Sequence, residues 1–337
     1  MSKPIRILGI ESSCDDTAAA VIENNSILSN LIANQEIHSK YGGVVPELAS
    51  RAHQQNIVPV VTGALNDAKL TLKEIDAIAY TKGPGLLGSL LVGNSFVKGL
   101  SLALNKPLLE VNHMQAHVLA HFIDDNASTP TFPFLCLTVS GGHTQIVKVT
   151  SPLNMEVIGT TLDDAAGEAF DKAAKMMGIP YPGGPLIDKY SKEGDPNRFK
   201  FKVGKMKGYD FSFSGLKTGI LYFLREQKGL NPNFIDENLS DLCASIQKSI
   251  IDALFVKIEK AVEDFGIHEV AIAGGVSANS GLRNRLMEYE EKAWNVYLPK
   301  FEYCTDNAAM IAIAGKYLFE ANKFGRLSGG PEPRMKF

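Results

Sequence analysis

Apolar and polar positions along the chain form two similar series of predicted elements. Each series opens with three short apolar runs separated by polar turns. The runs lie at residues 5–11, 17–22 and 27–33, and again at 134–139, 144–149 and 155–160. Short apolar runs bounded by turn signals are typical of strands. Each half is therefore predicted to open on three strands joined by tight turns.

Helical patterns and buried strands follow in both halves. Helices are predicted at 46–66, 87–104, 165–177, 215–227, 239–265, from 280, and at 306–321, and buried strands at 77–81, 108–111 and 270–273. Strands that alternate with helices indicate an α/β fold. The repeated order favours a duplicated α/β domain with a cleft between the halves; an unduplicated α/β protein is the alternative.

A polar stretch at 124–130, which ends in proline, is the predicted domain boundary. The first lobe is predicted at 1–129 and the second at 130–305. The helix at 306–325 is expected to return to the first lobe, and the glycine- and proline-containing tail at 326–337 is expected to be irregular.

Length, net charge and cysteine spacing limit the classes of protein to which this chain can belong. The 337 residues suggest roughly two domains. The net charge of −3 means that nucleic-acid binding needs a local basic patch. Four cysteines without a CxxC spacing fit a reducing cytosol. Neither a signal peptide nor a run of 18 apolar residues occurs, so we expect a cytoplasmic protein without a membrane span.

Two polar turns are candidates for phosphate binding. They lie at residues 11–17 and 140–144, at matching places in the two halves, and they are rich in Ser, Thr and Gly. Exposed backbone N–H groups in such turns bind anions. Ordinary hairpins whose hydroxyls bond their own backbone are the alternative, but the matching positions favour a nucleotide cleft.

The stretch 272–283 joins a buried strand to a helix through Gly274-Gly275, and Asn279 is a candidate for ribose or phosphate contact. Its spacing is not GxGxxG, which argues against a dinucleotide fold. An acidic helix start at 163–172 is explained by the helix dipole, although Asp171 lies deeper in that helix. Gly184 and Asp188 follow as further candidates for ligand contact.

His113 and His117 form the sharpest local signal. An i, i+4 spacing on a helix places both imidazoles on one face, as in divalent-metal sites. The intervening residues lack the general-base glutamate of HExxH, which argues against a peptidase. Asp306 is a candidate third ligand; a plain helix N-cap is the alternative.

A basic segment interrupts this acidic chain. Its cations are Arg198, Lys200, Lys202, Lys205 and Lys207. Phe199 and Phe201 lie between them, and aromatic rings can stack on RNA bases while cations bind phosphates. A solvated strand face is the alternative reading.

Six motifs, in order, resemble the bacterial TsaD (Kae1/Qri7/Gcp) family over nearly the whole chain. They are GIESSCD at 9–15, YGGVVPE at 41–47 with ASR at 49–51 and His53, GPGL at 83–86, NHM at 112–114 with His117, SGGHT at 140–144, and GGVSAN at 274–279. Asp16 departs from the pattern, because many members have glutamate there.

The resemblance implies a two-lobed actin/Hsp70/sugar-kinase-like fold with duplicated ribonuclease-H-like domains. It implies transfer of threonylcarbamoyl from threonylcarbamoyl-AMP to the exocyclic amine of adenosine 37 in tRNAs that read codons starting with A. It also implies the partners TsaB and TsaE, with TsaC supplying the intermediate.

The same resemblance assigns residues to roles. His113, His117 and Asp306 would hold one metal ion, Fe²⁺ or Zn²⁺. The donor would be held by Thr138, Val139, Ser140, Gly141, Gly142, Asp171, Gly184, Asp188 and Asn279. We expect the metal to act as a Lewis acid, with Asp15 or Asp16 as the base. A small-molecule kinase of the same fold and a metallopeptidase are the alternatives. A kinase gives the histidine pair no role, and the absence of a glutamate between the two histidines argues against a metallopeptidase.

Overall fold

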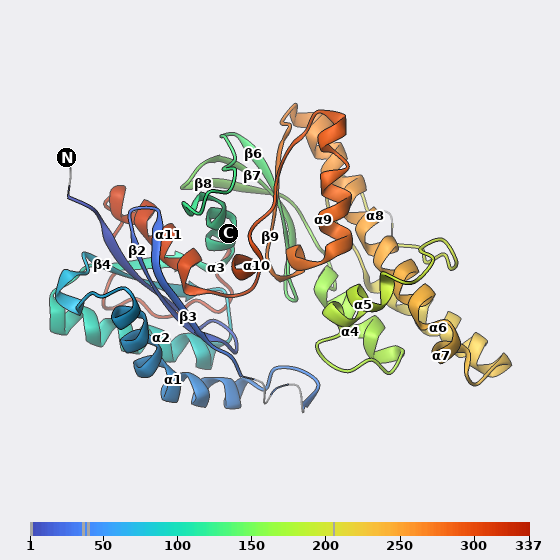
Figure 1. Ribbon diagram of the computed structural model, residues 1–337, viewed down its shortest axis with the longest axis horizontal. Helices are drawn as coiled ribbons and strands as arrows, with labels where there is room; N and C mark the ends of the chain where they lie inside the picture. The colour runs from blue at the N-terminus through green and yellow to red at the C-terminus, as the bar shows by residue number, and fades with distance from the viewer. Residues whose placement is uncertain (1–2, 36–37, 39–40, 205) are drawn as a thin grey trace. The chain divides into compact units, whose positions relative to one another are not determined.

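The computed structural model describes residues 3–35, 38, 41–204 and 206–337. Its chain divides into two compact units (Figure 1). The first unit comprises Met1–Thr129, Ser151–Met155 and Pro299–Phe337, and the second comprises Pro130–Thr150 and Glu156–Leu298. Each unit contains one five-stranded sheet.

The first sheet has the strand order β3-β2-β1-β4-β5. Its strands are β1 (Arg6–Glu11), β2 (Thr17–Glu23), β3 (Ser26–Ala33), β4 (Ala77–Gly83) and β5 (Leu108–Asn112). β1 pairs antiparallel with β2 and parallel with β4. The three antiparallel strands are the predicted hairpin series, and the two parallel strands follow crossover helices, as parallel pairing requires.

Helices cover both faces of the first sheet (Figure 1). They are α1 (Pro46–Asp67) and α2 (Leu87–Leu104) on one face and α11 (Ala308–Glu320) on the other; α3 (His113–Leu119) and α10 (Phe301–Cys304) are shorter. Leu8 and Ile10 of β1 pack in the core with α1. The opposite face of β1 is open to α11 because residue 9 is glycine; a Cβ there would lie 2.5 Å from the carbonyl oxygen of Ala308.

Among the described residues, α2 alone has the length and apolar composition of a membrane-crossing helix. Core helices of proteins without a membrane span meet the same criteria. Leu90 and Val97 of α2 are fully buried, and α2 packs against β4 and α1. Packing on the sheet accounts for the buried apolar residues of α2, whereas Leu87, Leu91 and Leu102 are exposed.

The second sheet has the order β10-β9-β6-β7-β8. Its strands are β6 (Phe134–Val139), β7 (Thr144–Ser151), β8 (Asn154–Thr160), β9 (Glu269–Ala273) and β10 (Asn295–Tyr297). β6 pairs antiparallel with β7 and parallel with β9. Read from β8 to β10, this is the order of the first sheet, so the predicted duplication is present in the topology.

The helices of the second unit share one apolar core with this sheet. They are α4 (Ala166–Met176), α5 (Gly183–Ser191), α6 (Ser214–Leu230), α7 (Phe234–Glu237), α8 (Leu239–Phe265) and α9 (Ser280–Met287). Leu135, Leu137 and Val139 alternate along β6 and face this core, as the period of a strand requires.

Two stretches predicted in the second lobe, residues 151–155 and 299–305, belong to the first unit instead. In the second of these stretches, the Lys300 ammonium donates to the Asp125 carbonyl at 2.7 Å. The tail at 326–337 is irregular as expected, but it is held to the first unit by backbone hydrogen bonds. Glu332 N–H donates to the Lys82 carbonyl at 2.8 Å, and Gly85 N–H donates to the Pro333 carbonyl at 3.2 Å.

Candidate functional site

Two histidines and one aspartate meet in the first unit. β5 ends at Asn112, whose side-chain oxygen accepts hydrogen bonds from Met114 N–H at 2.9 Å and Gln115 N–H at 3.2 Å. This N-cap starts α3 at His113, and His117 follows one turn later. The predicted i, i+4 pair is therefore on a helix, and both imidazoles are buried.

Asp306 reaches the same point from the other end of the chain. Its Oδ1 lies 3.3 Å from Nε2 of His113 and 3.3 Å from Nε2 of His117. Among the described residues, these three form a group whose potential ligand atoms lie within 4.8 Å of one another. Asp306 is not the N-cap of α11, because Asn307 Oδ1 accepts from Met310 N–H at 2.9 Å instead.

Glu11, at the end of β1, binds the far side of His113. Its Oε2 lies 3.1 Å from His113 Nδ1 and accepts from Thr81 Oγ1 at 2.6 Å, while its Oε1 accepts from Ser13 N–H at 2.5 Å. Glu11 is fully buried. A carboxylate on Nδ1 fixes the ring orientation and leaves Nε2 toward Asp306, which is the usual arrangement around metal-binding histidines.

The electrostatics of the cluster follow from this packing. Burial alone would lower the pKa of His113, but the carboxylates of Asp306 and Glu11 raise it well above its ordinary value. Burial lowers the pKa of His117. Burial opposes ionisation of Asp306, yet the two histidines hold its pKa far below the usual range. The cluster therefore favours an ionised aspartate facing two imidazole nitrogens.

The first polar turn is not an open phosphate loop. Ser12, Ser13 and Thr17 are buried. His53 of α1 holds the turn, with Nδ1 2.7 Å from Thr17 Oγ1 and Nε2 3.1 Å from the Cys14 carbonyl. Side chains of neighbouring helices thus bond the turn's polar groups, which differs both from an open phosphate loop and from a hairpin whose hydroxyls bond their own backbone.

Asp15 and Asp16 lie in this turn and are half-buried. They are not part of the group of potential ligands described above. Burial, followed by the negative charges of Asp15 and Asp306, raises the pKa of Asp16 to about 7. The carboxyl of Asp16 is therefore poised to gain or lose a proton near neutral pH.

The second unit contains a cavity of about 250 Å³. Five predicted donor-binding residues line it: Gly141, Asp171, Gly184, Asp188 and Asn279. Phe170, Pro182, Pro185 and Val276 contribute apolar walls. The volume is below the roughly 300–1,000 Å³ of pockets for whole drug-sized ligands, so the cavity suits one part of a larger ligand.

The polar residues of this cavity also build it. Asp171 Oδ1 accepts from the N–H groups of Gly183 at 2.8 Å and Gly184 at 3.1 Å, which caps α5. Asp188 Oδ1 accepts from Ser280 Oγ at 2.7 Å and from Ser280 N–H at 3.1 Å, which fixes the start of α9. Burial raises the pKa of Asp171.

Asn279 has structural partners on both sides of its amide. Its Oδ1 caps α9 through Leu282 N–H at 2.9 Å, and its Nδ2 donates to Gln247 Oε1 at 2.6 Å. Gln247, on α8, was not predicted as part of this site. The sequence could not indicate it, because only the fold brings α8 beside α9.

Four predicted donor residues do not line the cavity. Thr138 and Val139 are fully buried within β6. Ser140 closes its own turn, since its Oγ accepts from His143 N–H at 3.0 Å. Gly142 is exposed beside it. These four residues therefore cannot contact a ligand as part of the described wall of this cavity.

The described part of the predicted basic segment, residues 198–204 and 206–207, has no regular secondary structure. Arg198, Lys200, Lys202 and Lys207 are exposed; Lys205 lies outside the described residues. The sequence left open whether the aromatic residues stack on bases, and in the structure their rings face a helix. Phe199 and Phe201 pack against Phe223 of α6, with ring centroids 5.3 and 5.4 Å apart.

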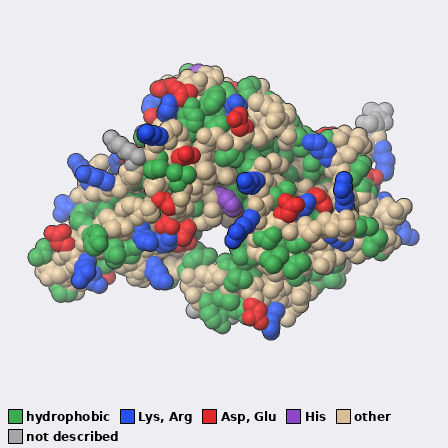
Figure 2. Space-filling view, turned by 180° about the vertical axis from the view of Figure 1, so that it is seen from behind, with side chains coloured by type: hydrophobic (Ala, Val, Ile, Leu, Met, Phe, Trp, Pro, Cys, Tyr) green, Lys and Arg blue, Asp and Glu red, His purple; other side chains and the backbone are tan. Residues whose placement is uncertain are grey.

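The space-filling view shows positive and negative side chains interspersed over the face it presents (Figure 2). This agrees with the small net charge of the chain. Contact with RNA would therefore depend on a local group of cations and not on the charge of a whole face.

The strand orders of the two units define the class: a duplicated α/β fold of the actin, Hsp70 and sugar-kinase type. Solved structures agree. Full-length HypF superimposes with a TM-score of 0.61 at 13% identity, over 95% of this chain and 47% of that chain. The ROK hexokinase of Thermus thermophilus gives 0.50 at 15% identity, over 94% and 100%. At these identities they show the fold alone.

The family follows from sequence. The profile of TsaD, tRNA N6-adenosine threonylcarbamoyltransferase, matches residues 26–313. The enzyme of that name from Christiangramia forsetii is 61% identical over 99% of this chain and 98% of its own length. The one from Riemerella anatipestifer is 60% identical over 96% and 95%. The chain therefore belongs to the TsaD family of tRNA-modifying transferases, whose substrate is tRNA.

Proposed function

We propose that this enzyme transfers the threonylcarbamoyl group from threonylcarbamoyl-AMP to the exocyclic amine of adenosine 37. This base lies directly 3′ of the anticodon in tRNAs that read codons starting with A. The observation that carries the proposal is the buried cluster of His113, His117 and Asp306, for which a kinase or a binding protein of this fold has no use.

The cluster suits a divalent metal ion. Two imidazole nitrogens and one carboxylate oxygen are the ligand set of Fe²⁺ facial triads and of catalytic Zn²⁺ sites with an open position. Nε2 of His117 lies 3.3 Å from Asp306 Oδ1 and is therefore the nitrogen that faces an ion held by this group, whereas Nδ1 is buried and has no hydrogen-bond partner among the described residues. We infer Fe²⁺ as the first candidate and Zn²⁺ as the second. When bound, the ion would supply Lewis-acid polarisation of the carbamoyl carbonyl.

The cavity of the second unit is proposed to bind the adenylate part of the donor. The N–H groups of the 140–142 turn are proposed to contact its phosphate. Asp171 bonds the N–H groups of α5 through Oδ1, and its Oδ2, which has no hydrogen bond to a described residue, is proposed to accept from a ligand hydroxyl. Asn279 would present its backbone and the surface of its amide, since its polar atoms are already bonded.

The transfer forms one bond between heavy atoms, breaks another, and moves one proton to a base. The adenosine amine attacks the carbamoyl carbon, the bond from that carbon to the AMP phosphate oxygen breaks, and AMP leaves. The amine loses one proton, and a base with a pKa near the working pH accepts it most effectively. Asp15 and Asp16 are the candidates; the raised pKa of Asp16 favours Asp16.

A small-molecule kinase and a metallopeptidase are the competing functions. A kinase would leave the buried His113 and His117 without a role. A peptidase of the HExxH type needs a glutamate between the two histidines, where this chain has Met114, Gln115 and Ala116.

We further propose that the enzyme works in the cytoplasm with TsaB and TsaE, and that TsaC supplies the threonylcarbamoyl-AMP. The four cysteines are free thiols, as a reducing compartment favours. The test is to supply purified threonylcarbamoyl-AMP and unmodified tRNA, with and without TsaB and TsaE. Modified adenosine 37 supports the proposal; intact donor and unmodified tRNA under every combination would refute it.

A further inference from the structure

Cations and apolar side chains alternate along the segment 198–203. Arg198, Lys200 and Lys202 are exposed, whereas Phe199, Phe201 and Val203 are half-buried and pack on the core of the second unit. The segment has no regular secondary structure, so its alternation of exposed and half-buried side chains is what places the cations on the outer side. The segment therefore presents a row of three cations to solvent.

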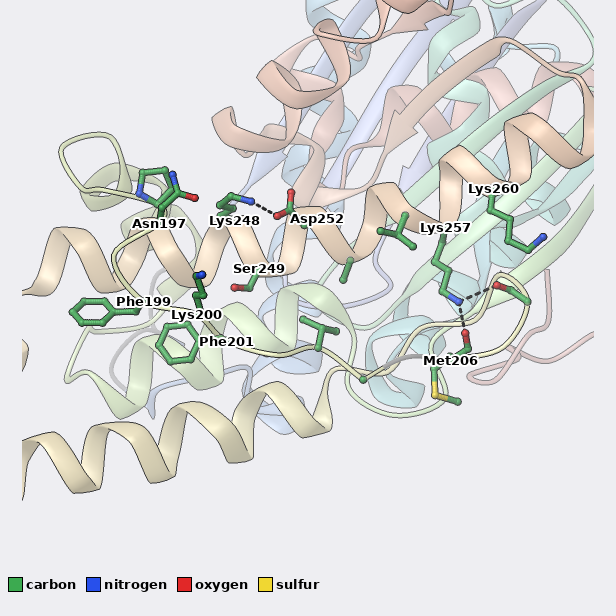
Figure 3. A pocket seen from close by; sticks show the side chains of 16 residues that line it. Asn197, Phe199, Lys200, Phe201, Met206, Lys248, Ser249, Asp252, Lys257 and Lys260 are labelled. Carbon is green, nitrogen blue, oxygen red and sulfur yellow. Dashed lines mark hydrogen bonds and ion pairs between the residues drawn. The ribbon is translucent and has the colours of Figure 1, made fainter.

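A cavity of about 750 Å³ lies between this segment and α8 (Figure 3). Lys200 lines it from the segment, and Lys248, Lys257 and Lys260 line it from α8. Asp252 is the one acidic residue of the described lining, and it pairs with Lys248 four residues away. The cavity wall thus carries four cations against one anion in a chain whose net charge is −3.

The backbone that carries these cations is held against α8 and α6. Lys257 Nζ donates to the carbonyls of Met206 at 2.6 Å and Gly208 at 2.9 Å (Figure 3). Phe199 N–H donates to Ser245 Oγ at 3.1 Å. These bonds tie both ends of the segment to α8, and the aromatic contacts with α6 hold its middle. A segment whose backbone is already held in place loses less conformational entropy on binding than a mobile loop would.

Lys200 and Lys202 are two cations of this surface whose charge is not neutralised by a described carboxylate. Neither forms an ion pair with a described residue, whereas Lys248 and Lys260 each have an aspartate four residues away. A polyanion is the partner that such a row of unpaired cations recognises, and tRNA is the polyanion on which this family acts.

We propose that the mouth of this cavity binds the phosphate backbone of the substrate tRNA, with Lys200 and Lys202 as the principal contacts and Lys248 and Lys260 beside them. This inference rests on the proposed function and deepens it by assigning a tRNA-binding surface. Recognition there is through charge, since Phe199 and Phe201 are packed inward and do not read bases.

The test is a double variant, Lys200→Gln with Lys202→Gln, compared with Lys228→Gln. Lys228 is an exposed lysine of α6 that does not line the cavity. Equilibrium binding of unmodified tRNA is measured over a range of salt concentrations, and the melting temperature confirms that each variant is folded. Each exposed ion pair contributes roughly a 2- to 5-fold gain in affinity.

We expect the double variant to bind tRNA about 4- to 25-fold more weakly. Its slope of log affinity against log salt should fall by about 1.4 to 1.8, at about 0.7 to 0.9 for each lost phosphate contact. Lys228→Gln should match the wild type. Equal affinity and slope in all three proteins would overturn the proposal.

Loss of a protein partner from the double variant, with unchanged tRNA binding, would overturn it in favour of a protein interface. Failure of the proposed function looks different. In that case the wild type would modify no tRNA, whatever the binding measurement shows.

Discussion

Replacing Glu11 by glutamine should weaken metal binding although Glu11 is not itself a ligand. The carboxylate accepts three hydrogen bonds in a fully buried position: from Ser13 N–H, from Thr81 Oγ1 and from His113 Nδ1. Glutamine has the same shape but replaces one acceptor oxygen by an NH₂ donor. At least one of the three donors then loses its partner, and the His113 ring loses the charge that orients it.

The size of the effect follows from the same contacts. Substitution of groups that orient metal-binding residues costs about 10- to 100-fold in metal affinity. One buried donor left without a partner costs about 1–3 kcal/mol of folding stability. We therefore expect Glu11→Gln to bind Zn²⁺ or Co²⁺ 10- to 100-fold more weakly and to unfold at a lower temperature.

The assay is competition with a chromogenic chelator, which reports affinity independently of catalysis. Glu110→Gln is the matched control, because Glu110 also lies in the first sheet but bonds Lys82 at 2.9 Å rather than a histidine. Wild-type metal affinity in Glu11→Gln, or an equal loss in both variants, would refute the assignment of Glu11 as a positioning residue.

Three further predictions test other parts of the account. His113→Ala should abolish transfer while the melting curve stays cooperative; a fully active variant would exclude the metal role. Asp16→Asn should stabilise the metal-free protein more at pH 8 than at pH 5. The reason is that the folded-state pKa of about 7 lies above the usual 3.8, so wild-type stability rises as pH falls through 7; a pH-independent difference in melting temperature contradicts this. Gly274→Ala should destabilise by at least about 2 kcal/mol, because φ is +87° and a Cβ would lie 2.6 Å from the Val139 carbonyl oxygen; denaturant unfolding measures it, and an unchanged midpoint contradicts the reasoning.

Features with a strong local pattern could be predicted from sequence. The helix at 239–265 has its predicted ends, because thirteen of its residues are buried along its length and Gly266 ends it in a left-handed conformation. The pairing of His113 with His117 needed only the geometry of one helical turn.

Features that depend on distant residues could not be predicted. α5 begins at Gly183-Gly184-Pro185, a poor helix start, and forms because Asp171 caps it from another helix. β10 has three residues, too few for a period, and exists through its pairing with β9. The role of Glu11 depends on the strand order β1-β4-β5, which brings Thr81 of β4 and His113, directly after β5, to its carboxylate.

For the aromatic residues of the basic segment, the sequence pattern is consistent with two different structures. A run of alternating cations and phenylalanines is equally consistent with an RNA-stacking surface and with an edge packed on a core. The apolar residues of α6, above all Phe223, decide in favour of packing. The charge pattern was informative about the exposed face, but the function of the rings depended on the neighbouring helix.

The most direct test of the central claim is a transfer assay with labelled threonine, bicarbonate, ATP, the partner proteins and unmodified tRNA, with and without a metal chelator. The account predicts label on adenosine 37 in the absence of chelator, and its loss when chelator is added or when His113 is replaced by alanine. Unlabelled tRNA, with phosphate transferred to a small metabolite, would contradict the account and support a kinase.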